Sequence, residues 1–298
     1  MTLYIFKRLL LMLPTLLGIL FFTFLIIQFV PGGPVEQLVN KLSGLDSITE
    51  SSSSSNTYRG SNGLSDEHIE QLNKFYGFDK PFIERFFIMI GNYASFDLGM
   101  SYFHNQSVGD LILSKLPVSI SLGLWSFIIV YLVSIPLGIK KAVNDGSRFD
   151  IISSTIVLIG YSIPGFVLGI GLIVLLGGGS FFDIFPTRGL VSDDWSNLSV
   201  IEKILDYLWH ITLPIICLII GSFAVMTMLT KNSFIDEINK LYTVTARAKG
   251  LSENKVLYSH VFKNAIIPIL TGFPAQFVSA FFTGSILIET IFSLDGIG

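Results

Sequence analysis

Residues 119–139 read SISLGLWSFIIVYLVSIPLGI, an uncharged run long enough to cross a lipid bilayer. A membrane-spanning helix needs about 20 mostly apolar residues, because each residue rises about 1.5 Å and the hydrocarbon core is about 30 Å thick. Four further uncharged runs meet this requirement: 9–30, 151–176, 211–230 and 265–288, the last interrupted by Pro268 and Pro274. The sequence therefore predicts an all-α, polytopic membrane protein with five spans.

The composition excludes several other classes of protein. The chain has 298 residues, of which 51% are hydrophobic and 14% charged, whereas globular proteins carry about 25% charged residues. Its net charge of −3 argues against a basic nucleic-acid-binding surface, and its single cysteine, Cys217, excludes a disulfide scaffold. The first run, 9–30, is longer than the roughly 7–15-residue core of a signal peptide, so we expect it to remain as an anchor.

Cationic residues predict the orientation. They gather near the N-terminus, between the second and third spans, and in residues 231–264: Lys7, Arg8, Lys140, Lys141, Arg148, Lys231, Lys240, Arg247, Lys249, Lys255 and Lys263. These three regions lie on one face if the spans alternate, and the positive-inside rule makes that face cytoplasmic. The N-terminus is then cytoplasmic, and the C-terminus of a five-span chain is outside.

The first outer segment, 31–115, has its own organisation. A serine run at Ser51–Ser55 predicts a flexible insertion. One short helix is expected to begin after Ser65 and end at Gly77, and a second to begin near Pro81 with the apolar stripe Phe82, Phe86 and Met89. A structural cap without a ligand is the favoured interpretation of these helices.

The cytoplasmic segment 231–264 is too long for a simple turn. Residues 237–249 favour a helix, Gly250 interrupts it, and Ser252 can cap a second helix. We call this predicted pair of helices the elbow. One interpretation is an interfacial element whose lysines extend toward the headgroups; the residue pattern below favours another.

Residues 245–252 read TARAKGLS and are followed by Val256, His260, Asn264, Ala265 and Pro268. This pattern resembles the cytoplasmic loop of peptide-transporting ABC permeases, the membrane subunits of binding-protein-dependent oligopeptide and dipeptide importers. Further similarity runs along nearly the whole chain, at 76–81, 96–101, 116–120, 160–164 and 287–298. Within the family, residues 56–60 and 140–150 resemble the YejB-type permeases, associated with microcin C and oligopeptide uptake.

The resemblance implies a type I ABC importer transmembrane domain at 116–298, after an anchor at 1–30 and a periplasmic segment at 31–115. The family has a sixth span after the position of Gly298, so we expect the domain to be C-terminally truncated in this sequence. The implied setting is the bacterial inner membrane. The implied partners are a homologous permease forming a heterodimer, two ABC ATPases and a periplasmic peptide-binding protein, with oligopeptides or microcin C-like peptides as cargo.

The elbow would correspond to the loop that couples such permeases to the ATPase. The residues implied are Thr245, Ala246, Arg247, Ala248, Lys249, Gly250 and Leu251. Gly250 permits a sharp turn, and Arg247 and Lys249 can pair with acidic groups on an ATPase. Val244 stands where many ABC permeases carry an acidic residue, so no acid-mediated contact is expected there.

Two polar residues near the fifth span are candidates for the pathway or a gate. Gln276 could line a water-filled path or make a hydrogen bond between helices. Glu289 falls near the outer end of the span, where an interfacial or gate role is favoured over proton transport.

The sequence offers no catalytic or metal site. It contains no Gly-Lys dipeptide, hence no phosphate-binding loop, so ATP would be hydrolysed by partner subunits and this chain would bind no cofactor. Its four histidines lack metal-ligand spacing. The remaining alternatives are a secondary transporter driven by an ion gradient, which would need charged residues within the spans, an intramembrane enzyme, and a non-transporting membrane scaffold.

Overall fold

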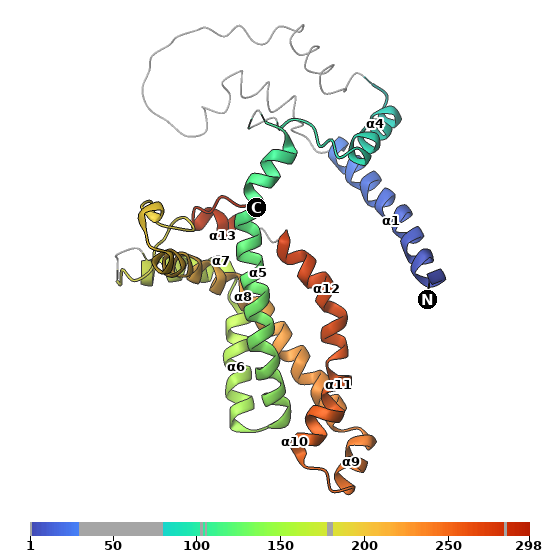
Figure 1. Cartoon of the computed structure of the whole chain (residues 1–298), viewed down its shortest axis with the longest axis vertical. Coiled ribbons are helices and arrows are strands. Elements are labelled where there is room, and N and C mark those ends of the chain that lie inside the picture. The colour runs from blue at the N-terminus through green and yellow to red at the C-terminus, as the bar shows by residue number, and fades with distance from the viewer. Residues whose placement is uncertain (1, 30–79, 102–103, 105, 178–180, 283–284) are drawn as a thin grey trace. The chain divides into compact units, whose positions relative to one another are not determined.

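The computed structural model describes residues 2–29, 80–101, 104, 106–177, 181–282 and 285–298. The described residues form helices joined by turns and contain no β-strand beyond one isolated bridge between Met100 and Ser107. The chain divides into two compact units, Met1–Leu111 and Ile112–Gly298 (Figure 1).

The described part of the first unit contains α1 (Thr2–Phe29) and α4 (Phe82–Ala94), besides the first residues of a helix that continues into the second unit. The ring centroid of Phe24 in α1 lies 5.0 Å from that of Phe82 and 5.5 Å from that of Phe86 in α4. Helix α4 begins directly after Pro81, which confirms the predicted second helix. Two of its three predicted stripe residues, Phe82 and Phe86, face Phe24 of α1. The predicted insertion around Ser51–Ser55 and the helix after Ser65 lie outside the described residues.

The second unit contains the remaining apolar helices. Those of the membrane region are α5 (Val108–Val143, which begins in the first unit), α6 (Arg148–Ser162), α7 (Gly165–Leu172), α8 (Val200–Ile238), α12 (Ile267–Phe281) and α13 (Ile286–Ile291). A π-helix (Ile173–Gly177) follows α7, and a short 3-10 helix (Trp195–Asn197) precedes α8. Among the described residues, four helical stretches can cross a membrane, or five when α6 and α7 count as one bent span. This agrees with the predicted polytopic fold.

The expected third span, 151–176, is bent by 92° between α6 and α7. The bend falls at Pro164, which has no N–H to continue the helix. The residue before it, Ile163, has φ −91° and ψ 119°, the extended conformation that a following proline favours. The prediction of one continuous apolar run was therefore correct in composition but wrong in shape.

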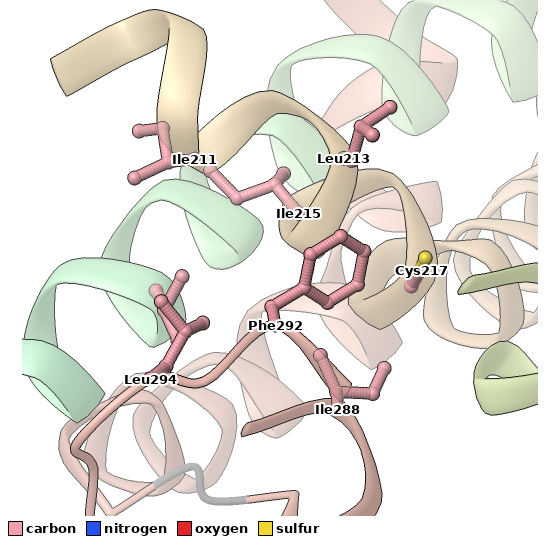
Figure 2. Close-up of a cluster of buried hydrophobic side chains, with 8 residues drawn as sticks. Ile211, Leu213, Ile215, Cys217, Ile288, Phe292 and Leu294 are labelled. Atoms are coloured by element: carbon pink, nitrogen blue, oxygen red, sulfur yellow. The ribbon is translucent and has the colours of Figure 1, made fainter. Parts of the chain in front are cut away.

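The expected fifth span, 265–288, is divided between α12 and α13. Helix α12 ends at Phe281. Helix α13 packs in a buried cluster with residues 211–217 of α8. In this cluster the ring of Phe292 points toward α8 and lies between Ile215 and Ile288 (Figure 2). Residues after α12 therefore pack against the bundle instead of extending one straight helix.

Two glycines allow the helices of the second unit to approach closely. A Cβ at Gly123 of α5 would lie 1.8 Å from the carbonyl oxygen of Ala280 in α12. A Cβ at Gly138, nearer the other end of α5, would lie 2.6 Å from Cβ of Thr230 in α8. Small residues at such contacts are typical of packed membrane helices. These contacts bring α5 close to α12 at one level and to α8 at another.

Candidate functional site

The elbow lies at one end of the second unit, and α13 and α7 lie toward the other (Figure 1). It consists of α9 (Leu241–Ala248), α10 (Glu253–Val256), a π-helix (Leu257–Val261) and α11 (Phe262–Ala265). The predicted first helix, 237–249, is wrong at its start, because α8 ends at Ile238 and α9 begins a new direction after Lys240. The buried hydroxyl of Thr243 donates to the carbonyl oxygens of Ile238 (2.7 Å) and Lys240 (2.6 Å), which fixes this bend.

The predicted turn at Gly250 is confirmed. Gly250 has φ +83°, a left-handed conformation that disfavours other residues. Its N–H donates to the carbonyl of Arg247 (2.9 Å), and the N–H of Leu251 donates to the carbonyl of Ala246 (3.3 Å). These two bonds form a Schellman motif, so the glycine both ends α9 and turns the chain into α10.

The inner face of the elbow is anchored to the membrane helices. Ala246 of α9, Val256, Val261 and Ala265 are buried together with Phe234 of α8. Ile139 and Ala142 of α5 complete this cluster. A close-packed contact of this kind transmits displacement instead of absorbing it. The elbow is thus packed against both α5 and α8.

The outer face of α9 is exposed and largely apolar. Leu241 and Val244 are 84% and 53% exposed, and Thr245 and Ala248 are also exposed. These four positions follow the i, i+3, i+4, i+7 spacing of one helix face. Thr245 and Ala248 are among the residues predicted to couple to an ATPase; Leu241 is not, although the same helical spacing places it on this face.

The cations of the elbow differ in what surrounds them. The Nε of Arg247 donates to both carboxylate oxygens of Glu253, at 2.9 and 3.2 Å. Lys249 is exposed and has no ion pair with any residue that the structure describes. Of the two cations expected to meet a partner's acidic groups, Lys249 is therefore available, whereas Arg247 already has an intramolecular partner.

Tyr242 joins the beginning and the end of the elbow. Its hydroxyl donates to Glu237 of α8 (2.6 Å) and accepts a hydrogen bond from the Nδ2 of Asn264 in α11 (3.3 Å). Burial raises the pKa of the Tyr242 hydroxyl, and its hydrogen bond to Glu237 raises it further. The neutral phenol therefore holds both helices at neutral pH.

A buried group of charges fastens α6 to α5 and α8 at the end of the unit that carries the elbow. Lys141 of α5 is fully buried and lies 3.3 Å from the carboxylate of Asp150, and it also donates to Ser153 and Ser154 at 2.9 and 2.6 Å. Lys231 of α8 contacts the other oxygen of Asp150 at 2.7 Å. In the sequence, Lys141 and Lys231 indicated only the topology, and this network was not predicted.

A cavity of about 570 Å³ lies between α5, α8 and α12. Its lining is mostly apolar and aromatic, with the polar residues Ser126, Tyr131, Ser222, Gln276 and Ser279. Gln276 is exposed in this cavity. The structure thus places Gln276 at an open space between helices. This is the location that lining a path, the first of the two interpretations, requires.

Glu289 occupies a different place. It is 4% exposed, and its carboxylate accepts hydrogen bonds from the backbone N–H groups of Ser285 (3.3 Å) and Gly298 (2.9 Å). It does not line the cavity that contains Gln276. The structure therefore does not bring the two candidate pathway residues together, and Glu289 organises the segment after α13.

Comparison with known proteins identifies the setting of these features. Residues 134–298 match the family described as binding-protein-dependent transport system inner membrane component. The peptidoglycan transport system permease protein YejB of Agrobacterium fabrum is 58% identical over 310 residues, covering 99% of this chain and 85% of the relative.

Other relatives have the same coverage. The inner membrane ABC transporter permease protein YejB of Escherichia coli O157:H7 is 52% identical over 312 residues, which cover 99% of this chain and 86% of the relative. The dipeptide transport system permease protein DppB of Escherichia coli K12 is 32% identical over 311 residues, with 99% and 85% covered. These matches confirm the resemblance to peptide permeases, including the YejB type. The chain is therefore a multi-pass inner-membrane protein of the binding-protein-dependent transport family, a permease subunit of a peptide ABC transporter.

Proposed function

We propose that this chain forms half of the translocation pathway of an ATP-driven oligopeptide importer and is driven by a separate ATPase that grips the elbow. The observation that carries the proposal is the two-sided character of α9. Its inner residue Ala246 is packed against α8 and α5, while Leu241, Val244 and Ala248 present an exposed apolar face. An exposed apolar face beside a free cation, Lys249, suits a protein partner.

The proposal assigns distinct tasks to the coupling residues. Thr245, Ala248 and Lys249 would contact the ATPase, together with Leu241 and Val244. Ala246 and Leu251 would transmit movement through the buried cluster, and Gly250 would set the angle between α9 and α10. Arg247 would hold α10 through Glu253. ATP would be bound and hydrolysed by the partner, and this chain would need no cofactor.

The wider assembly is proposed on the same basis. A homologous permease would complete a heterodimer, with two ATPases on the cytoplasmic side and a periplasmic binding protein delivering peptide. The N-terminus and the elbow would be cytoplasmic, as the distribution of lysine and arginine predicts. Oligopeptides, including microcin C-like peptides, are the proposed cargo. The name of the Agrobacterium relative favours peptide-bearing fragments of peptidoglycan as a second candidate.

Co-purification with the ATPase tests this proposal. Replacing Val244 or Ala248 with Asp places a charge on the exposed face without touching the buried cluster, and each change should reduce ATPase recovery at least tenfold. Asn144→Asp is the matched control, because it adds the same single negative charge at an exposed position just after α5 and outside the elbow. Unchanged ATPase recovery with both α9 variants would show that this face is not the coupling surface.

A further inference from the structure

The cavity between α5, α8 and α12 has a volume and a lining that bear on how peptide would contact this protein. Its volume, about 570 Å³, lies within the range of about 300–1,000 Å³ that is common for ligand sites. None of the described residues that line it is Asp, Glu, Lys, Arg or His. Its polar groups are hydroxyls and one side-chain amide, set among aromatic and aliphatic side chains.

Two of these hydroxyls lack a hydrogen-bond partner. The Oγ of Ser126 and the phenolic oxygen of Tyr131 are buried, and neither bonds to any described residue. A hydroxyl can both donate and accept a hydrogen bond, and a peptide amide offers an acceptor and a donor. Buried polar groups are normally paired. Both oxygens are covered by protein atoms, so a rotation of either side chain toward the cavity would let peptide backbone supply the missing partner.

The glycines of the cavity wall keep it open. A Cβ added at Gly221 of α8 or at Gly272 of α12 would meet no atom within 4 Å. These positions are therefore not helix contacts like Gly123, and the missing side chains leave room in the cavity.

We infer that this cavity is a transit subsite that contacts peptide through its backbone amides and uncharged surface, and that it does not select peptides by charge. The inference rests on the proposed function. A fixed charge in a poorly screened wall would attract peptides of one sign and repel the other. A neutral wall of hydroxyl, amide and aromatic groups treats acidic and basic peptides alike.

Charge placed in the cavity tests the inference. The complete transporter, with its ATPase and binding protein, is reconstituted in proteoliposomes and supplied with Ala-Ala-Ala, Ala-Glu-Ala or Ala-Lys-Ala. Gln276→Glu should shift the ratio of Ala-Lys-Ala to Ala-Glu-Ala transport at least tenfold above the wild-type ratio, and Gln276→Lys should shift it in the opposite direction. Dividing by the wild-type ratio removes the preference of the binding protein.

A matched pair separates a local effect from general electrostatic steering. Ser196→Glu and Ser196→Lys place the same charges on the exposed 3-10 helix outside the cavity and should leave the ratio within twofold of wild type. If neither Gln276 variant transports any of the three peptides, the same substitutions at Ser222, on the α8 wall of the cavity, test the inference instead.

The possible outcomes separate failure of this inference from failure of the proposed function. If Ala-Ala-Ala is transported but neither Gln276 nor Ser222 variants change the charge ratio, the cavity is not on the peptide's path and the inference fails alone. A shift of equal size in the Ser196 variants also overturns it. If the wild-type transporter moves none of the three tripeptides, the proposed function fails with it.

Discussion

Lys231 of α8 lies 2.7 Å from the carboxylate of Asp150 in the first turn of α6. The side chain of Ser147 caps this helix by accepting a hydrogen bond from the backbone N–H of Asp150. The same carboxylate faces the fully buried Lys141 of α5 at 3.3 Å. Three helices thus meet at one carboxylate, two turns of α8 before the elbow. The junction therefore ties α6 to both α5 and α8 close to the elbow.

Removing Lys231 should destabilise the second unit. Lys231→Met leaves part of the charge of Asp150 uncompensated, and breaking a buried ion pair typically costs about 3–5 kcal/mol. Thermal unfolding in detergent measures the loss. Asp145→Asn is the control: Asp145 also contacts Lys231, at 2.9 Å, but its side chain is 56% exposed, so its loss should cost under about 1 kcal/mol. Equal effects of the two variants would contradict the view that burial decides the strength of this junction.

Removing Phe234 should loosen the elbow. Phe234 is fully buried beneath Ala246, Val256 and Val261, and a Phe→Ala change in a core costs about 3–5 kcal/mol. Hydrogen exchange should then increase in α9 and α10 before it increases in α6. Val225→Ala on the same helix is the control, because Val225 is 56% exposed. If α9 and α10 stay protected in Phe234→Ala, the buried cluster does not hold them.

Gly123 and Gly221 should respond oppositely to the same added methyl group. In Gly123→Ala, the new Cβ would meet the carbonyl oxygen of Ala280, so α5 and α12 must separate, at a cost of at least about 1–3 kcal/mol. In Gly221→Ala the Cβ meets open space, and the helix should be as stable as wild type or slightly more so. Unfolding temperatures of the two variants check this. A tolerated Gly123→Ala would rule out the close contact between α5 and α12.

The elbow should weaken at high pH through Tyr242. Its pKa in the folded protein is raised above the usual 10.0, because burial and the hydrogen bond to Glu237 favour the neutral phenol. The contribution to stability is complete below pH 10 and is lost as the pH rises through the raised value. Tyr242→Phe cannot ionise, so its unfolding temperature should fall less than that of wild type between pH 9 and pH 11. Parallel pH profiles would contradict this role.

The sequence predicted the apolar helices and the glycine turn because both depend on local chemistry. Length and lack of charge suffice for a span, and the left-handed backbone at Gly250 suits glycine. Pro164 is also a local signal for a bend. A span predicted from hydropathy alone ignores it, because the run around this proline is uncharged throughout. Composition could not show that 265–288 divides after Phe281, because the packing of α13 on α8 is a tertiary contact.

The candidate site was only partly predictable for the same reason. Residues 245–251 were found by their pattern, but the pattern does not tell which of them face inward: Ala246 is buried, Lys249 is exposed, and Arg247 is paired with Glu253. In the junction of Lys141, Asp150 and Lys231, Lys141 and Asp150 are 9 residues apart, but Lys231 follows Asp150 by 81 residues. No local rule pairs them, and as isolated lysines they indicated only the cytoplasmic side.

Cysteine labelling at Lys249 tests whether the elbow is cytoplasmic and is held by an ATPase. The natural Cys217 is buried and is replaced by serine to give a cysteine-free background. Lys249→Cys is then exposed to a membrane-impermeant maleimide in inside-out inner-membrane vesicles, with and without the ATPase subunits. Lys249→Cys should be labelled in the absence of the ATPase, and at least tenfold more slowly in its presence. Labelling only in right-side-out vesicles, or at a rate that the ATPase does not change, would contradict it.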